Sequence, residues 1–270
     1  MKPVLGIVHH LAKSGGTIIC RCLGCMQSAV LLSEVHPLVD DKYEGILLHP
    51  LEQAYSWFDL FSQEEIYILE FLEAQAPIPF SEVISLIYTK VLEKHQTLIL
   101  RDWNHLDFLG YPFQLPTGQL STNIALQAHF DLLEIATVRH PIDQWLSMKN
   151  WTILSSTNVN DYLKGYWNFL SCCTGKMPII RYEDFCQTPQ QTMQLMCKHL
   201  DLVYDQNFIN KWMNYHCITG HVDNKNQHLK AKIYPDRSQT LELFQKNKYY
   251  QEIIDQLEYD HSPSHRLSTV

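Results

Sequence analysis

The segment of the chain best suited to chemistry lies near its start and reads His10-Leu11-Ala12-Lys13-Ser14-Gly15-Gly16-Thr17. Two adjacent glycines let consecutive backbone N–H groups turn toward a ligand, and the first N–H groups of a following helix add partial positive charge. The segment therefore predicts a cradle for an anion, with a tight turn that binds nothing as the alternative. In the ATP-binding pattern G-x-x-x-x-G-K-[ST] a lysine precedes the hydroxyl residue, whereas here Gly16 does, so ATP with magnesium fits poorly.

A second candidate segment is Ile135-Ala136-Thr137-Val138-Arg139-His140-Pro141-Ile142-Asp143-Gln144-Trp145-Leu146-Ser147. Its apolar run predicts a buried strand that ends at Arg139, and Pro141 suits the first position of a helix. Ser147 then lies about two turns into that helix. An arginine at the carboxyl end of a strand can hold phosphate oxygens with its guanidinium fork. A surface ion pair is the alternative for an isolated arginine.

Both segments need a scaffold of strands and helices, and the hydrophobic pattern predicts one. Short apolar runs without helical period predict five strands, at 4–9, 29–32, 97–100, 132–138 and 177–180. Helical patterns occupy 17–28, 141–155, 158–171, 188–200 and 205–215, and residues 50–95 form a helical insertion that Pro77 and Pro79 break into at least two helices. Strands that alternate with helices predict a P-loop-like α/β fold, with a parallel sheet of about five strands flanked by helices. Such sheets bind their ligands at the carboxyl ends of the strands.

Together the two segments resemble the sulfotransferases that use 3′-phosphoadenosine 5′-phosphosulfate (PAPS). The family's 5′-phosphosulfate loop reads much like Lys-Ser-Gly-Thr-Thr, and its 3′-phosphate site is an arginine followed eight residues later by a serine, as Arg139 and Ser147 are here. A third segment, Ile179-Ile180-Arg181-Tyr182-Glu183-Asp184-Phe185, looks like the family's late strand and helix. Two departures stand out, since Gly16 replaces a hydroxyl residue and Ile18 stands where an aromatic residue is common.

The resemblance implies a role for each residue of the site. Lys13 would neutralise the bridging oxygen of the leaving group, the loop from Ser14 to Ile18 (Ser14, Gly15, Gly16, Thr17, Ile18) would hold the 5′-phosphosulfate, and Arg139 with Ser147 would hold the 3′-phosphate. The base that removes the acceptor proton is implied to be Glu34, after the second strand, or else His105, beyond the third. We favour Glu34 over His105, because fourteen histidines make each one a weak signal. His36 lies two residues beyond Glu34, and no metal is required.

The expected reaction moves a sulfuryl group from PAPS to a hydroxyl or amine of a small-molecule or carbohydrate acceptor, whose pocket the helical insertion would line. Two other functions compete with it. A P-loop small-molecule kinase lacks support because the loop lysine is absent from its usual place, and a non-catalytic nucleotide-binding protein would keep the phosphate sites without turnover.

Composition bounds these expectations. The chain has 270 residues, 46% of them hydrophobic, and a net charge of −8 that gives no support to nucleic-acid binding. Residues 40–80 contain nine carboxylates and one lysine, Lys42, and so carry this whole charge. The late segment 220–237 is basic, with Lys225, Lys230, Lys232 and Arg237, and either closes over the nucleotide or is an ordinary solvated loop.

The apolar run before His9 is too short for a secretion signal, and no run of eighteen apolar residues occurs, so a cytoplasmic protein is expected. The eight cysteines then read as free thiols, and Cys20, Cys22 and Cys25 do not converge on a helix as zinc ligands would. We expect one sulfotransferase-like domain over residues 1–258, with a polar C-terminal tail at 259–270.

Overall fold

The computed structural model describes residues 2–39, 49–110, 115–149, 157–220, 229–231, 234 and 237–260. Five strands form one parallel sheet in the order β2-β3-β1-β4-β5, which confirms the predicted fold class. The strands are β1 (Val4–His10), β2 (Ala29–Val35), β3 (Thr97–Asp102), β4 (Asp131–Val138) and β5 (Ile179–Arg181).

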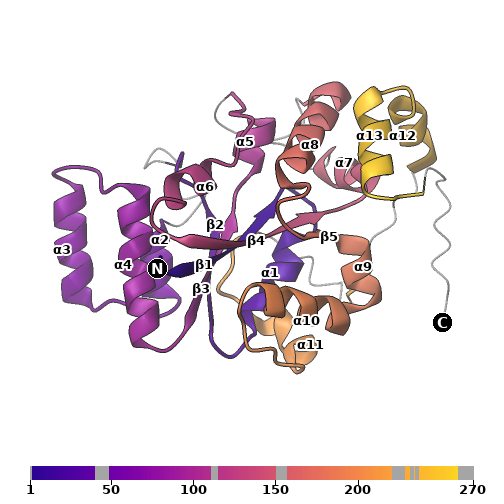
Figure 1. Cartoon of the computed structure of the whole chain (residues 1–270). Coiled ribbons are helices and arrows are strands. Elements are labelled where there is room, and N and C mark those ends of the chain that lie inside the picture. Colours follow the sequence, from indigo (N-terminus) through magenta and orange to yellow (C-terminus); the bar gives the residue numbers. More distant parts are fainter. Residues whose placement is uncertain are drawn as a thin grey trace.

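Helices cover both faces of this sheet (Figure 1). They are α1 (Gly16–Gly24), α2 (Pro50–Ser56), α3 (Gln63–Glu73), α4 (Phe80–Glu93), α5 (His105–Leu109), α6 (Ser121–Leu126), α7 (Pro141–Lys149), α8 (Val159–Cys173), α9 (Tyr182–Gln187), α10 (Pro189–His199), α11 (Phe208–Lys211), the 3₁₀ turn η3 (Trp212–Asn214), α12 (Arg237–Phe244) and α13 (Lys248–Gln256). The first helix ends at Gly24 rather than Ser28, because the chain turns there to enter β2.

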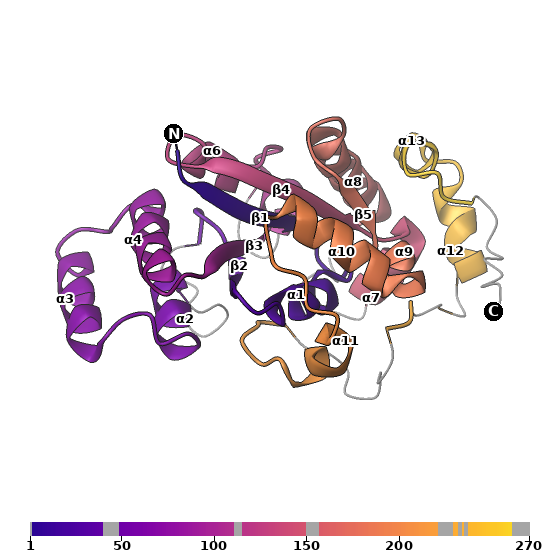
Figure 2. The ribbon, with the colours of Figure 1, turned by 60° about the horizontal axis from the view of Figure 1, so that its bottom comes forward.

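Strand alternation divides the core between the two faces. Val8, Leu31, Ile99 and Ile135 pack with α1, α10 and α11 on one face. Their neighbours in the strands pack with helices of the other face: Ile7, Leu32 and Leu100 with α2, α3, α4 and α6, and Ala136 with α5, α7, α8 and α13. The second view shows α1, α10 and α11 together on one side of the sheet (Figure 2).

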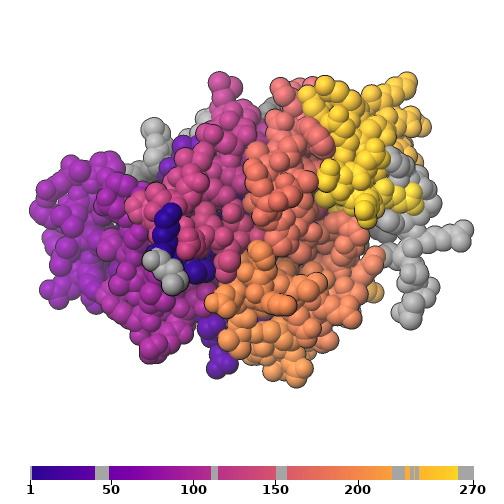
Figure 3. All heavy atoms as spheres, in the orientation of Figure 1, coloured from indigo at the N-terminus to yellow at the C-terminus, as the bar shows by residue number. Residues whose placement is uncertain are grey.

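The helical insertion has three helices where the sequence predicted at least two. Ser62 caps α3 with a capping box, in which its side chain and that of Glu65 each accept from the other residue's backbone N–H. Pro79 precedes α4, as the predicted break requires, and α4 buries Val83, Ile84, Ile87 and Val91. In the space-filling view this insertion forms one end of the molecule and α12 and α13 form the other (Figure 3).

Some boundaries differ from the predicted ones. The helix expected at 205–215 is two short pieces, α11 and η3, and the helix expected at 141–155 is described only as α7, since 150–156 lie outside the described residues. Lys225, Lys232 and most of the expected C-terminal tail lie outside them as well. No helix in the described part of the chain is long and apolar enough to cross a membrane.

Candidate active site

The glycine-containing segment lies where the sequence placed it, between β1 and α1 at the carboxyl edge of the sheet. Lys13 and Gly15 both have left-handed backbone, with φ of 63° and 89°. Such a tightly wound loop is a conformation in which successive N–H groups form an anion-binding concavity. No side chain caps the start of α1, so its first N–H groups are left for a ligand or solvent.

Two close contacts explain why both glycines are needed. A Cβ on Gly15 would lie 2.2 Å from the Tyr182 ring, and one on Gly16 would lie 2.8 Å from the His10 ring. The hydroxyl oxygen of Ser14 is buried and has no hydrogen-bond partner in the described structure. A buried hydroxyl without a partner is costly, and an anion held by this loop would satisfy it, so the residues present fit a phosphosulfate group.

Lys13 is exposed, yet the protein around its ammonium group lowers its pKa by desolvation, while the Glu34 carboxylate acts in the opposite direction. The structure therefore brings together Lys13 and Glu34, which are 21 positions apart in the chain. A cation and a carboxylate beside one anion loop are the two kinds of group that group transfer to a hydroxyl requires.

Glu34 does not follow the second strand, as the sequence had suggested, but lies within β2 at a bulge. The pairing with β3 shifts between Ser33 and Val35, and Glu34 adopts a left-handed φ of 55°. β2 is an edge strand, and Gln53 of α2 takes the place of a further strand there: its side-chain oxygen accepts from Ser33 N at 2.7 Å and its amide donates to Ser33 O at 2.9 Å. The bulge interrupts the regular alternation of side chains between the two faces of the sheet at Glu34.

Arg101 is a central residue of the site that the sequence analysis did not identify. It is 2% exposed. Its Nε donates to His10 Nε2 at 2.8 Å, and its Nη2 lies 2.9 Å from both Thr17 Oγ1 and Glu34 Oε1. The guanidinium thus joins the anion loop to the candidate base. In the sequence it is one arginine at a strand end, which only the pairing of β3 with β1 and β2 brings to the loop.

His105, the alternative base, is the first residue of α5 and is buried. Desolvation, reinforced by the charges of His36 and Arg101, lowers its pKa to about 3. His36 donates from Nε2 to Asp107 at 3.0 Å and accepts from Leu38 N at its Nδ1. Both ring nitrogens of His36 are therefore engaged in holding Asp107 and the chain after β2.

Arg139 is 6% exposed, so the alternative of a surface ion pair is wrong. Its Nη1 donates to the Lys13 carbonyl at 3.5 Å, and its guanidinium carbon lies 5.5 Å from the Tyr182 ring centre and 5.8 Å from that of Tyr234. The structure therefore brings Arg139 to the anion loop. Ser147 is half-buried on α7, and its pairing with Arg139 stays a prediction, as does the contact expected of Ile18.

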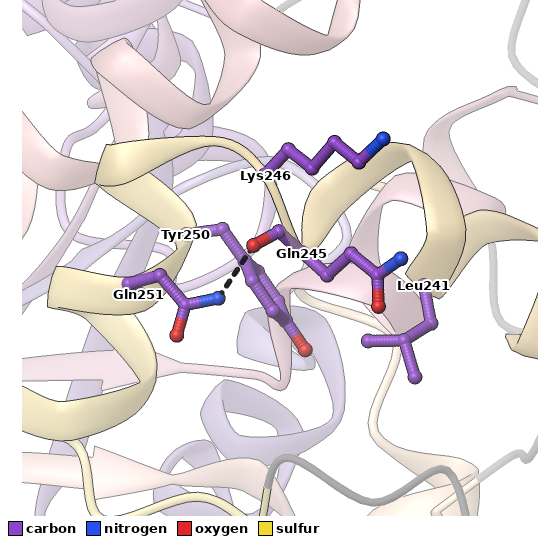
Figure 4. A pocket seen from close by; sticks show the side chains of 5 residues that line it. All are labelled: Leu241, Gln245, Lys246, Tyr250 and Gln251. Carbon is purple, nitrogen blue, oxygen red and sulfur yellow. Dashed lines mark hydrogen bonds between the residues drawn. The ribbon is translucent and has the colours of Figure 1, made fainter.

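Two other candidate features belong to the C-terminal helices α12 and α13. Arg237, from the basic late segment, is buried at the start of α12 and pairs with Asp143 at 3.4 Å. A hollow of about 440 Å³ lies at α12 and α13, and its lining shares no residue with the anion loop (Figure 4). Among the described residues, no group of three or more His, Cys, Asp or Glu is placed to hold a metal ion.

Comparison with known proteins gives the class of fold. No family model and no curated protein matches the sequence. The chain is similar to the sulfotransferase domain of the Synechococcus PCC 7002 olefin synthase, with a TM-score of 0.62 and 16% identity over 96% of this chain and 95% of that one. It is also similar to the mouse sulfotransferase SULT7A1 complexed with PAP, with a TM-score of 0.50 and 12% identity over 96% and 90% of the two chains. The chain has the sulfotransferase fold.

Proposed function

We propose that this protein is a PAPS-dependent sulfotransferase that transfers a sulfuryl group to a hydroxyl or amine of a small-molecule or carbohydrate acceptor. The observation that carries the proposal is the anion loop, in which the buried Ser14 hydroxyl lacks a partner while Lys13, Arg101 and Arg139 lie around it. All eight cysteines are free thiols, which supports the proposal that the protein works in the reducing cytoplasm.

Each residue has one task in this proposal. Lys13 stabilises the negative charge that develops on the leaving oxygen. The N–H groups of Gly15 to Thr17 bind the 5′-phosphate, with Ser14 as a further hydroxyl donor, and Arg139 with Ser147 binds the 3′-phosphate. PAPS supplies the sulfuryl group and needs no metal to do so. The insertion α2–α4 joins the site through Gln53, which supports its role beside the acceptor.

Glu34 is the better base of the two candidates. Its side chain is 15% exposed, so an acceptor can approach it, and it lies near the Lys13 ammonium. The pKa of about 3 makes the His105 imidazole a poor proton acceptor at neutral pH. His105 then contributes to the wall of the pocket.

Ligand binding to the purified chain without magnesium tests the donor site. Adenosine 3′,5′-bisphosphate should stabilise the protein by about 2.7 kcal/mol at a hundredfold excess over its Kd, measured as a shift in Tm. AMP should do far less because it leaves Arg139 unused. Arg139→Gln should abolish the preference for the bisphosphate, whereas Lys211→Gln, which removes a cation from the exposed pair with Asp205, should leave it unchanged.

Three results would contradict the proposal in different ways. Equal shifts from AMP and the bisphosphate would remove the 3′-phosphate site. Magnesium-dependent turnover of ATP would favour a kinase. Tight binding of the bisphosphate with no turnover of PAPS by any acceptor would favour a non-catalytic nucleotide-binding protein.

A further inference from the structure

Thr219 lies on the segment after η3, far from Glu34 in the sequence, and holds the end of β2 through both its backbone and its side chain. Its hydroxyl donates to Glu34 Oε2 at 2.5 Å. Its N–H donates to Ser33 Oγ at 3.1 Å, and its carbonyl accepts from Arg101 Nη1 at 3.1 Å. The hydroxyl oxygens of Thr219 and Ser33 are 2.8 Å apart.

These contacts fix the direction of the Thr219 hydroxyl. Threonine has few side-chain rotamers because it is branched at Cβ. Here the backbone N–H and the backbone carbonyl of Thr219 are both hydrogen-bonded, so the backbone that carries the side chain is held as well. The next residue, Gly220, sits so close to the anion loop that a Cβ on it would lie 3.1 Å from Thr17 Oγ1. The segment is thus seated against the loop and against β2 at once.

Glu34 needs such a support. Its backbone is left-handed at a bulge on an edge strand, and a carboxylate at the end of a flexible side chain has several rotamers available there. Arg101 contacts one carboxylate oxygen, Oε1, and Thr219 contacts the other, Oε2. With both oxygens held, the carboxylate keeps one orientation and retains further lone pairs for a proton.

We propose that Thr219 is a positioning residue that orients the Glu34 carboxylate for proton removal from the acceptor. The inference rests on the proposed sulfotransferase function, in which Glu34 is the base. It adds a residue from a distant part of the chain to the site, and it requires the hydroxyl group of Thr219 rather than its volume.

The titration of Glu34 tests the contact directly. Protein labelled with ¹³C at the glutamate carboxyl carbon gives one signal that is missing in Glu34→Gln and so belongs to Glu34. Thr219→Val keeps the shape of the side chain but removes a hydrogen bond to the charged form, so the titration midpoint of that signal should move up by roughly half a unit to one unit. Thr219→Ser should restore the midpoint. Thr89→Val, which removes a helix hydroxyl bonded to Ser85 O, is the matched control and should leave it in place.

Turnover provides the second arm, with PAPS as donor and water as the acceptor that is always present. Attack of water oxygen on sulfur breaks the bond between sulfur and the bridging oxygen, and gives sulfate, the 3′,5′-bisphosphate and the proton taken by the base. Thr219→Val should slow this release about tenfold or more and shift its low-pH limb upward, with bisphosphate affinity unchanged. Thr219→Ala serves the same purpose if the valine variant does not fold.

The two arms separate the failures of the two proposals. An unchanged Glu34 midpoint in Thr219→Val would overturn the positioning role. A loss of bisphosphate affinity in Thr219→Val would also overturn it, because the substitution would then have disturbed the donor site as well as Glu34. Failure of the wild-type protein to bind the bisphosphate would instead overturn the proposed function, and the titration would still decide whether Thr219 holds Glu34.

Discussion

His9 and His10 are neighbours in the sequence, yet the fold shifts their pKa values in opposite directions. His10 faces α1, where burial and the Arg101 charge hold its pKa well below its usual value. His9 points to the opposite face, where its Nδ1 lies 2.9 Å from Asp102 and its Nε2 lies 3.0 Å from Glu134. Burial alone would lower its pKa, but hydrogen bonds to the two carboxylates outweigh it and raise the pKa to about 9. Strand alternation therefore decides which histidine is charged.

The same reasoning at the residue scale separates the two candidate bases. Glu34→Gln keeps the shape of the side chain but cannot accept a proton, so turnover of PAPS should fall by roughly a hundred- to ten-thousandfold. His105→Ala should reduce turnover less than Glu34→Gln does, because the His105 imidazole is already a weak base and its proposed role is only to form part of the wall of the acceptor pocket. Release of adenosine 3′,5′-bisphosphate measures both.

A carboxylate base also leaves a low-pH limb in the rate profile, which should disappear in Glu34→Gln along with most of the activity. An active Glu34→Gln protein together with an inactive His105→Ala protein would reverse the assignment of the base.

At the scale of elements, the turn from β1 into α1 is the part of the structure on which the site depends most. Gly15 is the residue before α1, in left-handed backbone, and the position that a Cβ would take on it is occupied by the ring of Tyr182, the first residue of α9. β5 and α9 thus cover the loop that β1 and α1 define. The shape of the anion site is set by contact between two βα units rather than by one motif.

Gly15→Ala should therefore destabilise the fold for two separate reasons. A left-handed alanine costs roughly 1–2 kcal/mol, and displacing the Tyr182 ring adds roughly 1–3 kcal/mol, so the free energy of unfolding in urea should fall by about 2–5 kcal/mol. Gly118→Ala is the matched control, because Gly118 has a φ of 71° and nothing within 4 Å of its Cβ position. It should lose only the roughly 1–2 kcal/mol that a left-handed alanine costs, and equal losses in the two variants would show that the Tyr182 ring moves aside at no cost.

The elements explain what the sequence could and could not predict. Runs such as Val4 to His9 predicted strands because a buried parallel strand is continuously apolar, and the two glycines predicted the loop because few other residues fit it. Helices α5, α6 and α9 have five or six residues each, too short for a helical period to show. Arg101 and Thr219 lie 118 positions apart, and no local pattern relates residues at that distance.

At the scale of the whole molecule, the carboxyl edge of the sheet carries a separate polar network on each face. On the α1 face Arg101 joins His10, Glu34 and Thr17. On the other face the buried His9 and Asp102 and the half-buried Glu134 form a charged group that Thr122 and Asn123 of α6 complete through hydrogen bonds. Asn104 ties the two networks together, since its Oδ1 accepts from His10 N at 3.0 Å and its amide donates to Asp102 at 2.7 Å. The anion loop is thus anchored to charged groups on the opposite face of the sheet.

These networks give the protein a definite pH dependence of stability. His9 has a folded-state pKa of about 9 against 6.5 when unfolded, so its contribution is complete below pH 6.5 and is lost as pH rises toward 9. His105, with a folded-state pKa of about 3, and His10, also lowered, act in the opposite sense: they stay neutral when folded, so stability rises with pH up to 6.5.

The free energy of unfolding in urea should therefore peak near pH 6.5 and fall by roughly 2 kcal/mol by pH 8.5. Above that range buried thiols such as Cys20, whose pKa burial raises to about 12, add a loss of their own. His9→Gln should flatten the decline between 6.5 and 8.5, and His105→Asn should flatten the rise below 6.5. A wild-type curve that is level from pH 6.5 to 8.5 would show that His9 is neutral in the folded protein and that its two carboxylates do not hold it charged.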